Sequence, residues 1–585
     1  MYVKTTSRKT KNGTAVRYLH LAHNEWDPVA GRSVPKILHS FGREDQLDRT
    51  AITRLVASLS KLLDPAEALA ATTAPGLAFL ESRPYGGTYA LDQIWRRLGI
   101  DQILIQLLQG RRGRPRDVSA ERVLFALVAN RALAPSSKLA AADWISNDAH
   151  IDGLAATSDD ACYRAMDWLH DVRERLEAEI YNQVANQLNL EVDLLFFDTT
   201  STYFELDEAD EPIARDEHGL PVSPPASASA SASASASDGD GDGDGEQDRA
   251  GFRTYGKSKD SRDDLPQIVI GMAVTRSGIP VRVWSWPGNT SDSALIRQVK
   301  DDMRDWTLSK IVWVADRGFA SAANRRYPRR GDHHYIIGEK LRSDSPEITT
   351  ALSRQGRYAD ITANMRIKEV KVSEHERFVI CHNPEAAARD AHVREQLITQ
   401  LRELIDGSDT LSVIKRAELR GKISARPALN RYLRTTPGGR LRINARAINA
   451  EANLDGKYLL RCSDPHLPAA DIAVGYKQLL QVERGWRDMK SIIDLRPVYH
   501  RREERIRAHV ILCWLALLLV RIIENTVGDT WVSIRRHLNR LQIGTFHGPA
   551  GRFRQRTEPT KVHRDLLTKL GIAAPQQIIE LAALS

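Results

Sequence analysis

Three residues of the segment 476–490 are spaced so that they could act together on a phosphodiester. Glu483 follows Tyr476 by seven residues and precedes Lys490 by seven. Seven residues are close to two helical turns, so on a helix the three side chains share one face, together with Arg487. Such a carboxylate can hold a metal while the cations hold phosphate oxygens. An amphipathic helix with ordinary ion pairs explains the same pattern equally well.

Two further acids each close a short apolar run. Asp198 ends the run 193–198 and Asp316 ends the run 311–316, and both runs are typical of buried strands. An unpaired carboxylate there costs several kcal/mol unless a cation compensates it. If the two strands lie side by side, both acids meet at one sheet edge. A glutamate such as Glu483 would then complete a pocket for two divalent metals about 4 Å apart, suited to displacement at phosphorus.

Each acid also has a structural explanation. Asp198 could cap a turn through the following threonines, and Asp316 could pair with Arg317. For the third position, Glu339 follows a strand, and Asp488 lies on the same helix as Glu483. Composition and periodicity do not rank these rivals.

Composition favours a polyanionic partner. The formal net charge is +8, but residues 225–249 hold six acids against Arg249 alone, so the rest of the chain carries about +13. A basic surface suits nucleic acid first. The four cysteines are dispersed, which indicates a reducing compartment and no zinc module. We expect a soluble, cytoplasmic, nucleoid-associated protein without a membrane span, because the longest apolar run, 510–520, is too short and is typical of a buried helix.

The chain changes character several times. Residues 1–50 alternate apolar and polar positions, and 84–190 are helical in pattern. Residues 205–249 lose the apolar pattern and contain a Ser-Ala repeat and an Asp-Gly repeat, so we expect disorder there. A hairpin is predicted at Ser277-Gly278, and the strands and helices that follow favour a mixed sheet with helices packed on it.

Several stretches of the sequence resemble a known protein family. FFDTTSTYFE around Asp198, VADRGFAS around Asp316 and the segment 476–490 resemble the DDE transposases of bacterial insertion sequences, in the group with a Tyr-x2-Arg-x3-Glu-x6-Lys signature. The stretches SKDSRDDLPQIVIGMAV, GIPVRVWSWPGNTSD and LRPVYHRREERIRAHVILCWLAL are similar to the insertion-sequence-four superfamily, nearest its branch numbered sixteen thirty-four. The resemblance covers residues 1–50 loosely and 84–530 well.

The resemblance implies a site and a reaction. Asp198, Asp316 and Glu483 become the metal ligands for two Mg²⁺ ions, with Mn²⁺ as a substitute, and Tyr476, Arg487 and Lys490 become contacts to DNA phosphates. It also implies binding of element ends in double-stranded DNA, synapsis by a homodimer, and cut-and-paste transposition through strand cleavage and strand transfer.

The implied fold is a multidomain α/β protein. An RNase H-like mixed sheet core carries a β-rich insertion before the last catalytic helix, and a small β module and a helical domain precede it. The expected parts are a β-rich module (1–50), a helical DNA-binding domain (51–190), the first part of the core (191–340), the insertion domain (341–470), the second part of the core with the catalytic and buried helices (471–530), and a C-terminal region suited to dimerisation (531–585).

The chain departs from the family pattern in two places. Leu479 stands where the signature arginine is expected, so that phosphate contact must come from elsewhere or be absent. Relatives that form hairpins stack a flipped base on an aromatic, and no Trp occurs between residues 317 and 485. The remaining aromatic candidates are Tyr335, Tyr358, Phe378, Tyr432 and Tyr458.

Other basic residues could also contact DNA. Arg112 and Arg114 match the core of an AT-hook, although a solvated basic loop explains them as well. Arg501 and Arg502 belong to a basic cluster after the catalytic helix. Two rival functions stay open: an RNase H-like DNA nuclease without strand transfer, and a non-catalytic DNA-binding remnant.

Overall fold

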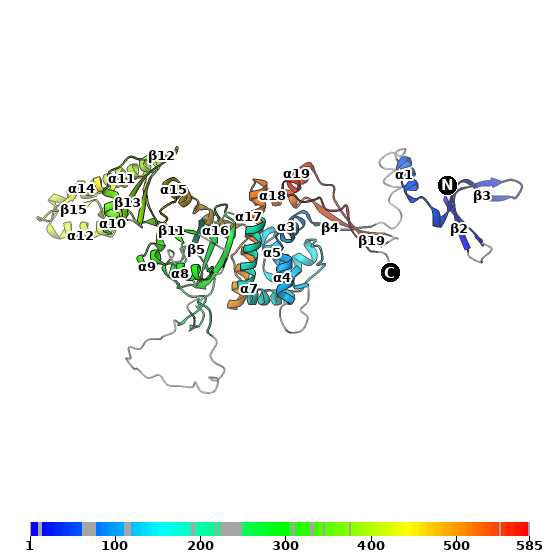
Figure 1. Cartoon of the computed structure of the whole chain (residues 1–585), viewed down its shortest axis with the longest axis horizontal. Helices are drawn as coiled ribbons and strands as arrows, with labels where there is room; N and C mark the ends of the chain where they lie inside the picture. Colours follow the sequence, from blue (N-terminus) through cyan, green and yellow to red (C-terminus); the bar gives the residue numbers. More distant parts are fainter. Residues whose placement is uncertain are drawn as a thin grey trace, which may run out of the picture. The chain divides into compact units, whose positions relative to one another are not determined.

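The mixed pattern of helical and alternating segments folds into two units. The computed structural model describes residues 2–9, 15–60, 78–109, 119–188, 194–216, 219–222, 249–304, 306, 311–327, 333–342, 345–373, 376–548 and 551–582. One unit comprises residues 1–81, 544–555 and 580–585, and the other comprises 82–543 and 556–579. Figure 1 draws the elements of both.

In the first unit, the alternating N-terminal pattern forms an antiparallel sheet of order β1-β2-β3, as the sequence predicts. Its strands are β1 (Tyr2–Lys9), β2 (Ala15–Asp27) and β3 (Arg32–Arg43), and helix α1 (Arg49–Ser60) follows. The expected continuation of this helix to residue 70 lies outside the described residues. A four-stranded sheet has the order β20-β19-β18-β4 and consists of Ala78–Pro84 (β4), Gln542–Gly548 (β18), Gly551–Arg556 (β19) and Ile578–Ala582 (β20).

The second unit is built on a nine-stranded mixed sheet of order β12-β13-β14-β17-β11-β10-β5-β8-β9. Strand β5 pairs in parallel with β10 and antiparallel with β8, and β10 pairs in parallel with β11. The central strands are β5 (Leu194–Tyr203), β8 (Gln267–Val274), β9 (Pro280–Pro287), β10 (Val312–Ala315) and β11 (His334–Glu339). The predicted hairpin joins β8 to β9, and Gly278 in its turn has a φ of 75° that a side chain would disfavour.

The insertion is not β-rich as predicted but mixed. Four of its strands, β12 (Ala359–Thr362), β13 (Met365–Ser373), β14 (Glu376–His382) and β17 (Lys457–Cys462), extend the central sheet beyond β11. Its helices are α10 (Pro346–Ser353), α11 (Pro384–Ile405), α12 (Val413–Ser424), α13 (Pro427–Asn430) and α14 (Ala445–Ala452), and a short hairpin joins β15 (Leu433–Thr435) to β16 (Leu441–Ile443). The alternating strands are visible in the sequence, and so is the helical spacing of Val393, Leu397, Leu401 and Leu404 in α11, which the prediction of a β-rich insertion overlooked.

Helices from both ends of the second unit cover one face of the sheet. The helical pattern from 84 to 190 forms α3 (Gly86–Arg97), α4 (Ile100–Gln109), α5 (Ser119–Leu133), α6 (Lys138–Asp143) and α7 (Asp159–Gln187). Their buried side chains share one core with the sheet face that carries Phe196 and Val314. The other face packs against α8 (Asp292–Asp301), and α9 (Ala322–Arg326) lies next along the chain.

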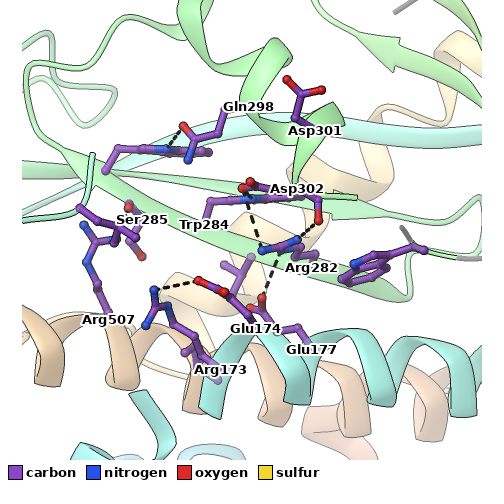
Figure 2. A pocket seen from close by; sticks show the side chains of 15 residues that line it. Arg173, Glu174, Glu177, Arg282, Trp284, Ser285, Gln298, Asp301, Asp302 and Arg507 are labelled. Atoms are coloured by element: carbon purple, nitrogen blue, oxygen red, sulfur yellow. Dashed lines mark hydrogen bonds and ion pairs between the residues drawn. The ribbon is translucent and has the colours of Figure 1, made fainter. Parts of the chain in front are cut away.

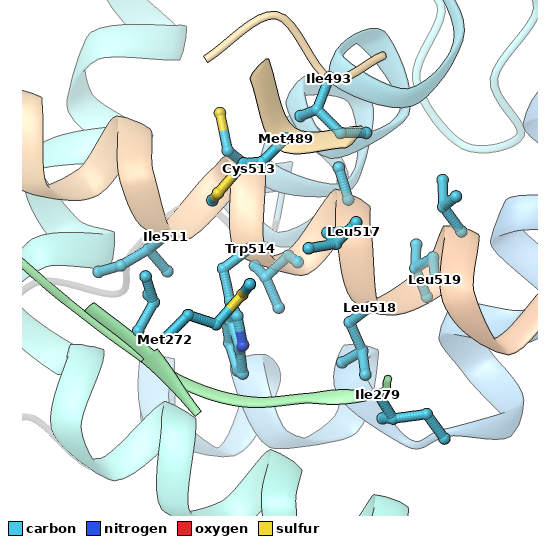
Figure 3. Close-up of a cluster of buried hydrophobic side chains, with 14 of the residues drawn as sticks. Met272, Ile279, Met489, Ile493, Ile511, Cys513, Trp514, Leu517, Leu518 and Leu519 are labelled. Atoms are coloured by element: carbon cyan, nitrogen blue, oxygen red, sulfur yellow. The ribbon is translucent and has the colours of Figure 1, made fainter. Parts of the chain in front are cut away.

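The predicted buried helix is α17 (Glu503–Val527). Its apolar side chains pack around Trp514 against Met272 of β8 and Met489 of the neighbouring helix, as Figure 3 shows. By length and composition it is the one described helix that could cross a membrane, but its most apolar window is wholly buried inside the protein. The remaining elements are α15 (Ala469–Lys477), α16 (Leu480–Ser491), α18 (Trp531–Leu538) and α19 (Lys561–Lys569).

The segment predicted to be disordered is partly ordered. Residues 205–216 and 219–222 are ordered within the second unit, where β6 (Ile213–Ala214) and β7 (Arg249–Ala250) form a two-stranded ladder. Arg215 forms a buried ion pair with Glu503 at 3.0 Å, and Arg253 pairs with Asp210. The prediction failed here because charged partners far along the chain replace the missing apolar pattern. Both repeats lie outside the described residues.

Candidate active site on the central strands

Asp198 and Asp316 lie beside each other on adjacent strands. The parallel pairing of β5 with β10 ends at Phe197 and Ala315, and each acid is the next residue along its strand. Side chains alternate along a strand, so both acids point to the face that also carries Phe196 and Val314. That face is the one that helix α16 covers. Both acids are half-buried.

The prediction that β5 ends at Asp198 is wrong. The strand continues to Tyr203 through antiparallel pairing with β8, because the threonines after Asp198 favour an extended backbone. Asp198 therefore lies where the parallel partner ends, not where the strand ends. The proposed turn cap through Thr199 and Thr200 is excluded by the same geometry.

The surroundings of Asp198 disfavour a lone negative charge. Burial, together with the carboxylates of Asp292 and Asp316, raises the pKa of Asp198 to about 6, even though Lys259 and a backbone hydrogen bond lower it. A cation bound between Asp198 and Asp316 would relieve this repulsion.

Tyr476 holds the second acid. Its hydroxyl donates a hydrogen bond to Oδ1 of Asp316 at 3.0 Å. Burial and the carboxylate of Asp316 raise the pKa of Tyr476, so the phenol stays protonated and remains a donor. Gly338 of β11 lies close by, and a Cβ there would overlap the Tyr476 hydroxyl. The tyrosine thus fixes the orientation of a site carboxylate.

The expected single helix from Tyr476 to Lys490 is two helices. α15 ends at Lys477 and α16 begins at Leu480, with a turn at residues 478 and 479. Leu479, at the place of the signature arginine, is 8% exposed and packs in the main core. An arginine there would need a buried partner, so the leucine is compatible with this turn.

The side chains of α16 differ in their surroundings. Glu483 and Arg487 are exposed and follow each other by one turn. Lys490 is half-buried, and its ammonium donates to both oxygens of Asp260 at 3.0 and 3.1 Å. Trp486 is buried in the core, as expected.

The rivals of Glu483 are held in ion pairs. Glu339 is paired with Arg461 at 2.6 Å, and Asp488 contacts Arg521. In the described part of the chain no ion pair or hydrogen bond of the Glu483 side chain is found. Among the three acids, Glu483 is therefore the one whose charge is not already compensated.

The acids do not form a closed metal cage. Among the described residues, no group of three or more His, Cys, Asp or Glu side chains is placed to hold a metal ion. Two neighbouring half-buried carboxylates nevertheless fit Mg²⁺, which binds through one or two carboxylates and completes its shell with substrate phosphate oxygens and water.

Sequence reasoning missed three residues next to the acids. Lys259 pairs with Asp292 at 3.1 Å, and both contact Thr199, the residue after Asp198. Asp260 lies between Lys490 and Arg496. A sign was present in the sequence, since Lys259, Asp260 and Asp292 fall inside the stretches that carry the family resemblance.

Some of the basic side chains near the predicted DNA contacts are exposed, and others are held in ion pairs. Arg501 and Arg502 are exposed before α17. In the same basic cluster, Arg505 pairs with Asp167, and Arg507 is buried against Glu503. Arg112 and Arg114 lie outside the described residues. The structure thus divides the cluster into an exposed pair and a buried structural part.

The aromatic candidates for base stacking differ in their burial. Tyr335, Phe378 and Tyr432 are buried and have no free ring face. Tyr358 and Tyr458 are half-buried, and the Tyr458 ring stacks on that of Tyr476 with centroids 6.2 Å apart.

A separate cavity of about 410 Å³ lies along the edge strand β9 (Figure 2). Arg282 lies between Glu177 and Asp302, and the Trp284 ring nitrogen donates to Asp302 at 2.9 Å. Burial raises the pKa of Glu177 to about 7. Each of the three arginines that line the cavity is paired with a carboxylate, so the cavity offers little to an anion.

Known proteins agree with the sequence resemblance. A family model described as "Transposase DDE domain" matches residues 244–519, and one described as "IS1634 family transposase, N-terminal domain" matches residues 3–70. A solved structure of the piggyBac transposase synaptic complex with hairpin DNA is 12% identical, covers 79% of this chain and 82% of its own, and has a TM-score of 0.33, too low to support an argument. No curated protein sequence matches the chain. The chain belongs to the DDE transposases of bacterial insertion sequences, in the IS1634 branch.

Proposed function

We propose that the protein is a divalent-metal-dependent transposase that binds the ends of its element, cleaves DNA strands there and joins them to a target. The observation that carries this proposal is the side-by-side placement of Asp198 and Asp316 on the face that α16 covers. Two neighbouring half-buried carboxylates, of which Asp198 has its pKa raised to about 6 mainly by burial, are expensive to retain without a cation to bind.

The strand arrangement supports an RNase H-like core. Strands β9, β8 and β5 are antiparallel neighbours, and β10 and β11 follow in parallel, which is the mixed order of such a core. In this proposal the insertion enters after β11 and returns before α15, so that α16 can carry the third acid.

Asp198, Asp316 and Glu483 would hold the metal. Bound Mg²⁺ would lower the pKa of the attacking water or hydroxyl and stabilise the leaving oxygen. The chain's own contribution is orientation: Tyr476 fixes the Asp316 carboxylate, and Lys259 fixes the backbone next to Asp198. Glu483 would join them from an exposed position on α16, where substrate can approach.

The exposed cations are the proposed DNA contacts. Arg487 lies one turn from Glu483, and Arg501 and Arg502 lie at the start of α17. Lys490 can contact a phosphate only by sharing its ammonium with Asp260. We also propose that the helical segment 51–190 and the insertion 341–470 contact DNA, and that 531–585 contributes to a homodimer that brings two ends together.

The test uses purified full-length protein and DNA that carries the element's terminal repeats. We expect Mg²⁺-dependent nicking at the ends that Asp198→Asn, Asp316→Asn and Glu483→Gln abolish while end binding persists. Asp198→Asn should still fold, because it removes a charge that burial disfavours. Glu208→Gln changes an exposed glutamate outside the segments proposed to contact DNA; it is the matched control and should leave nicking unchanged.

Three results would separate the alternatives. Nicking without joining to target DNA would indicate a nuclease. End binding without nicking in the wild type would indicate a remnant. Full nicking activity in Glu483→Gln would refute the assignment of the third acid.

A further inference from the structure

The loop between β7 and β8 (residues 251–266) contacts both the strand that carries Asp198 and the helix that carries Glu483. Its residue Lys259 donates its backbone N–H to the Ser201 hydroxyl at 2.8 Å and its ammonium to the Thr199 carbonyl at 2.8 Å. The same ammonium pairs with Asp292, the first residue of α8, at 3.1 Å, and the Thr199 hydroxyl donates to Asp292 at 2.7 Å. Lys259 therefore binds β5 immediately beside Asp198.

The next residue contacts the helix that carries Glu483. Asp260 accepts from Lys490 of α16 and from Arg496, each at 3.0 Å. The side chains of Asp260 and Lys490 are only 18% and 16% exposed, so solvent and salt screen this pair weakly. Removing one partner of such a pair leaves an uncompensated charge.

We propose that Lys259 and Asp260 form a tether that sets the position of α16 relative to β5, and thus of Glu483 relative to Asp198. Cα atoms of neighbouring residues are about 3.8 Å apart, so α16 cannot shift by much without breaking the contacts of one of the two residues. Lys259 and Asp260 are positioning residues: they touch the elements that carry the acids. The inference rests on the proposed metal-dependent cleavage.

A competing explanation makes a different prediction. If Asp260 only occupied Lys490 and Arg496 until DNA phosphate displaced it, its removal would strengthen DNA binding and leave the metal site unchanged. The tether predicts the reverse, because a loosened α16 places Glu483 less well for the metal while the exposed cations still bind DNA.

The experiment compares Lys259→Met and Asp260→Asn with the wild type in the complex with end DNA. Direct Mn²⁺ binding, from the electron paramagnetic resonance signal of free Mn²⁺, and the Mg²⁺ concentration for half-maximal nicking are both measured. Groups that orient metal ligands are typically worth 10- to 100-fold in metal affinity, so we expect both quantities to weaken by about that factor. Nicking should recover at high Mg²⁺. If a variant only lost folded protein, the amount of Mn²⁺ bound at saturation would fall, and the Mn²⁺ and Mg²⁺ concentrations for half-maximal binding and nicking would stay unchanged.

Matched controls come from the same loop. Lys257 is exposed, and Asp264 is exposed and pairs with Arg262, so Lys257→Met and Asp264→Asn should bind Mn²⁺ as the wild type does. The double variant Lys259→Met/Asp260→Asn should weaken Mn²⁺ binding no more than the more severe single variant does, because either change breaks the same link. If a charge variant fails to fold, Thr199→Val removes only a hydroxyl partner and should shift Mn²⁺ binding in the same direction by less.

Unchanged Mn²⁺ affinity in both single variants, additive effects in the double variant, or tighter DNA binding with normal metal binding would each overturn the tether while leaving the proposed function intact. Absence of metal-dependent nicking in the wild type would overturn the proposed function and the tether with it.

Discussion

One lysine side chain is buried in the helical part of the second unit. Lys138, the first residue of α6, is 3% exposed, and in the described part of the chain no carboxylate pairs with its ammonium. Its charged neighbour is Arg131, and two buried cysteines lie nearby. Burial is the main cause that lowers the pKa of Lys138 from 10.5 to about 7.

The sign of the effect on stability follows from proton binding. Between pH 10.5 and about 7 the unfolded chain holds a proton on Lys138 that the folded protein does not, so stability falls as the pH falls through this window. Below about pH 7 the cost is fully expressed. At about 1.36 kcal/mol for each pH unit between the two pKa values, this cost is roughly 5 kcal/mol.

We therefore expect Lys138→Met to stabilise the protein. Methionine is similar in length and carries no charge, so at pH 7 the variant should gain several kcal/mol, which for a unit of this size is a rise in Tm on the order of 5 °C. The gain should shrink steadily toward pH 10. Differential scanning calorimetry at several pH values measures it, with the exposed Lys415→Met as control. A gain that does not depend on pH, or a loss at pH 7, would refute the assignment of a strained, uncompensated ammonium.

Three further predictions concern other buried contacts. Burial lowers the pKa of His500 from 6.5 to about 3, so the wild type should lose stability as the pH falls through this range. His500→Phe should flatten this pH dependence in acid unfolding curves. An unchanged slope would contradict the prediction. Gly338→Ala should push the Tyr476 hydroxyl off Asp316. Both this variant and Tyr476→Phe should slow nicking by about tenfold, since a contact that positions a metal ligand is worth about that much. Wild-type nicking rates in both variants would exclude the positioning role of Tyr476. Glu503→Gln should cost about 3–5 kcal/mol in urea unfolding, because it removes the carboxylate that pairs with the buried guanidinium groups of Arg215 and Arg507. A change under 1 kcal/mol would show that the ordered part of 205–222 contributes little to stability.

The sequence by itself determined the features that depend on local periodicity. The apolar runs before Asp198 and Asp316 identify buried strands, and the eleven-residue run inside α17 identifies a buried helix. Ser277-Gly278 marks the hairpin because the turn needs a positive φ. The family resemblance is also a property of the sequence. These predictions need no knowledge of which distant segments meet.

Only the tertiary structure decided the partners of the charged side chains. Asp260 lies 230 residues before Lys490 and Arg215 lies 288 residues before Glu503, and in a chain that is 27% charged the sequence offers many equal choices. The same reason explains why charge pattern alone did not rank Glu483 against Glu339 and Asp488, both of which the structure pairs with arginines.

The tertiary structure also decided where elements end. β5 continues past Asp198 because β8 provides an antiparallel partner. The helix expected from Tyr476 to Lys490 is interrupted at residues 478 and 479, whose backbone N–H groups bond to the carbonyls three residues before them. Local patterns are compatible with either outcome, since strand and helix ends depend on which hydrogen-bond partners and core positions the rest of the chain supplies. Residue spacing and the family resemblance therefore proposed the acids of the candidate site, and packing between distant segments determined which contacts their side chains make.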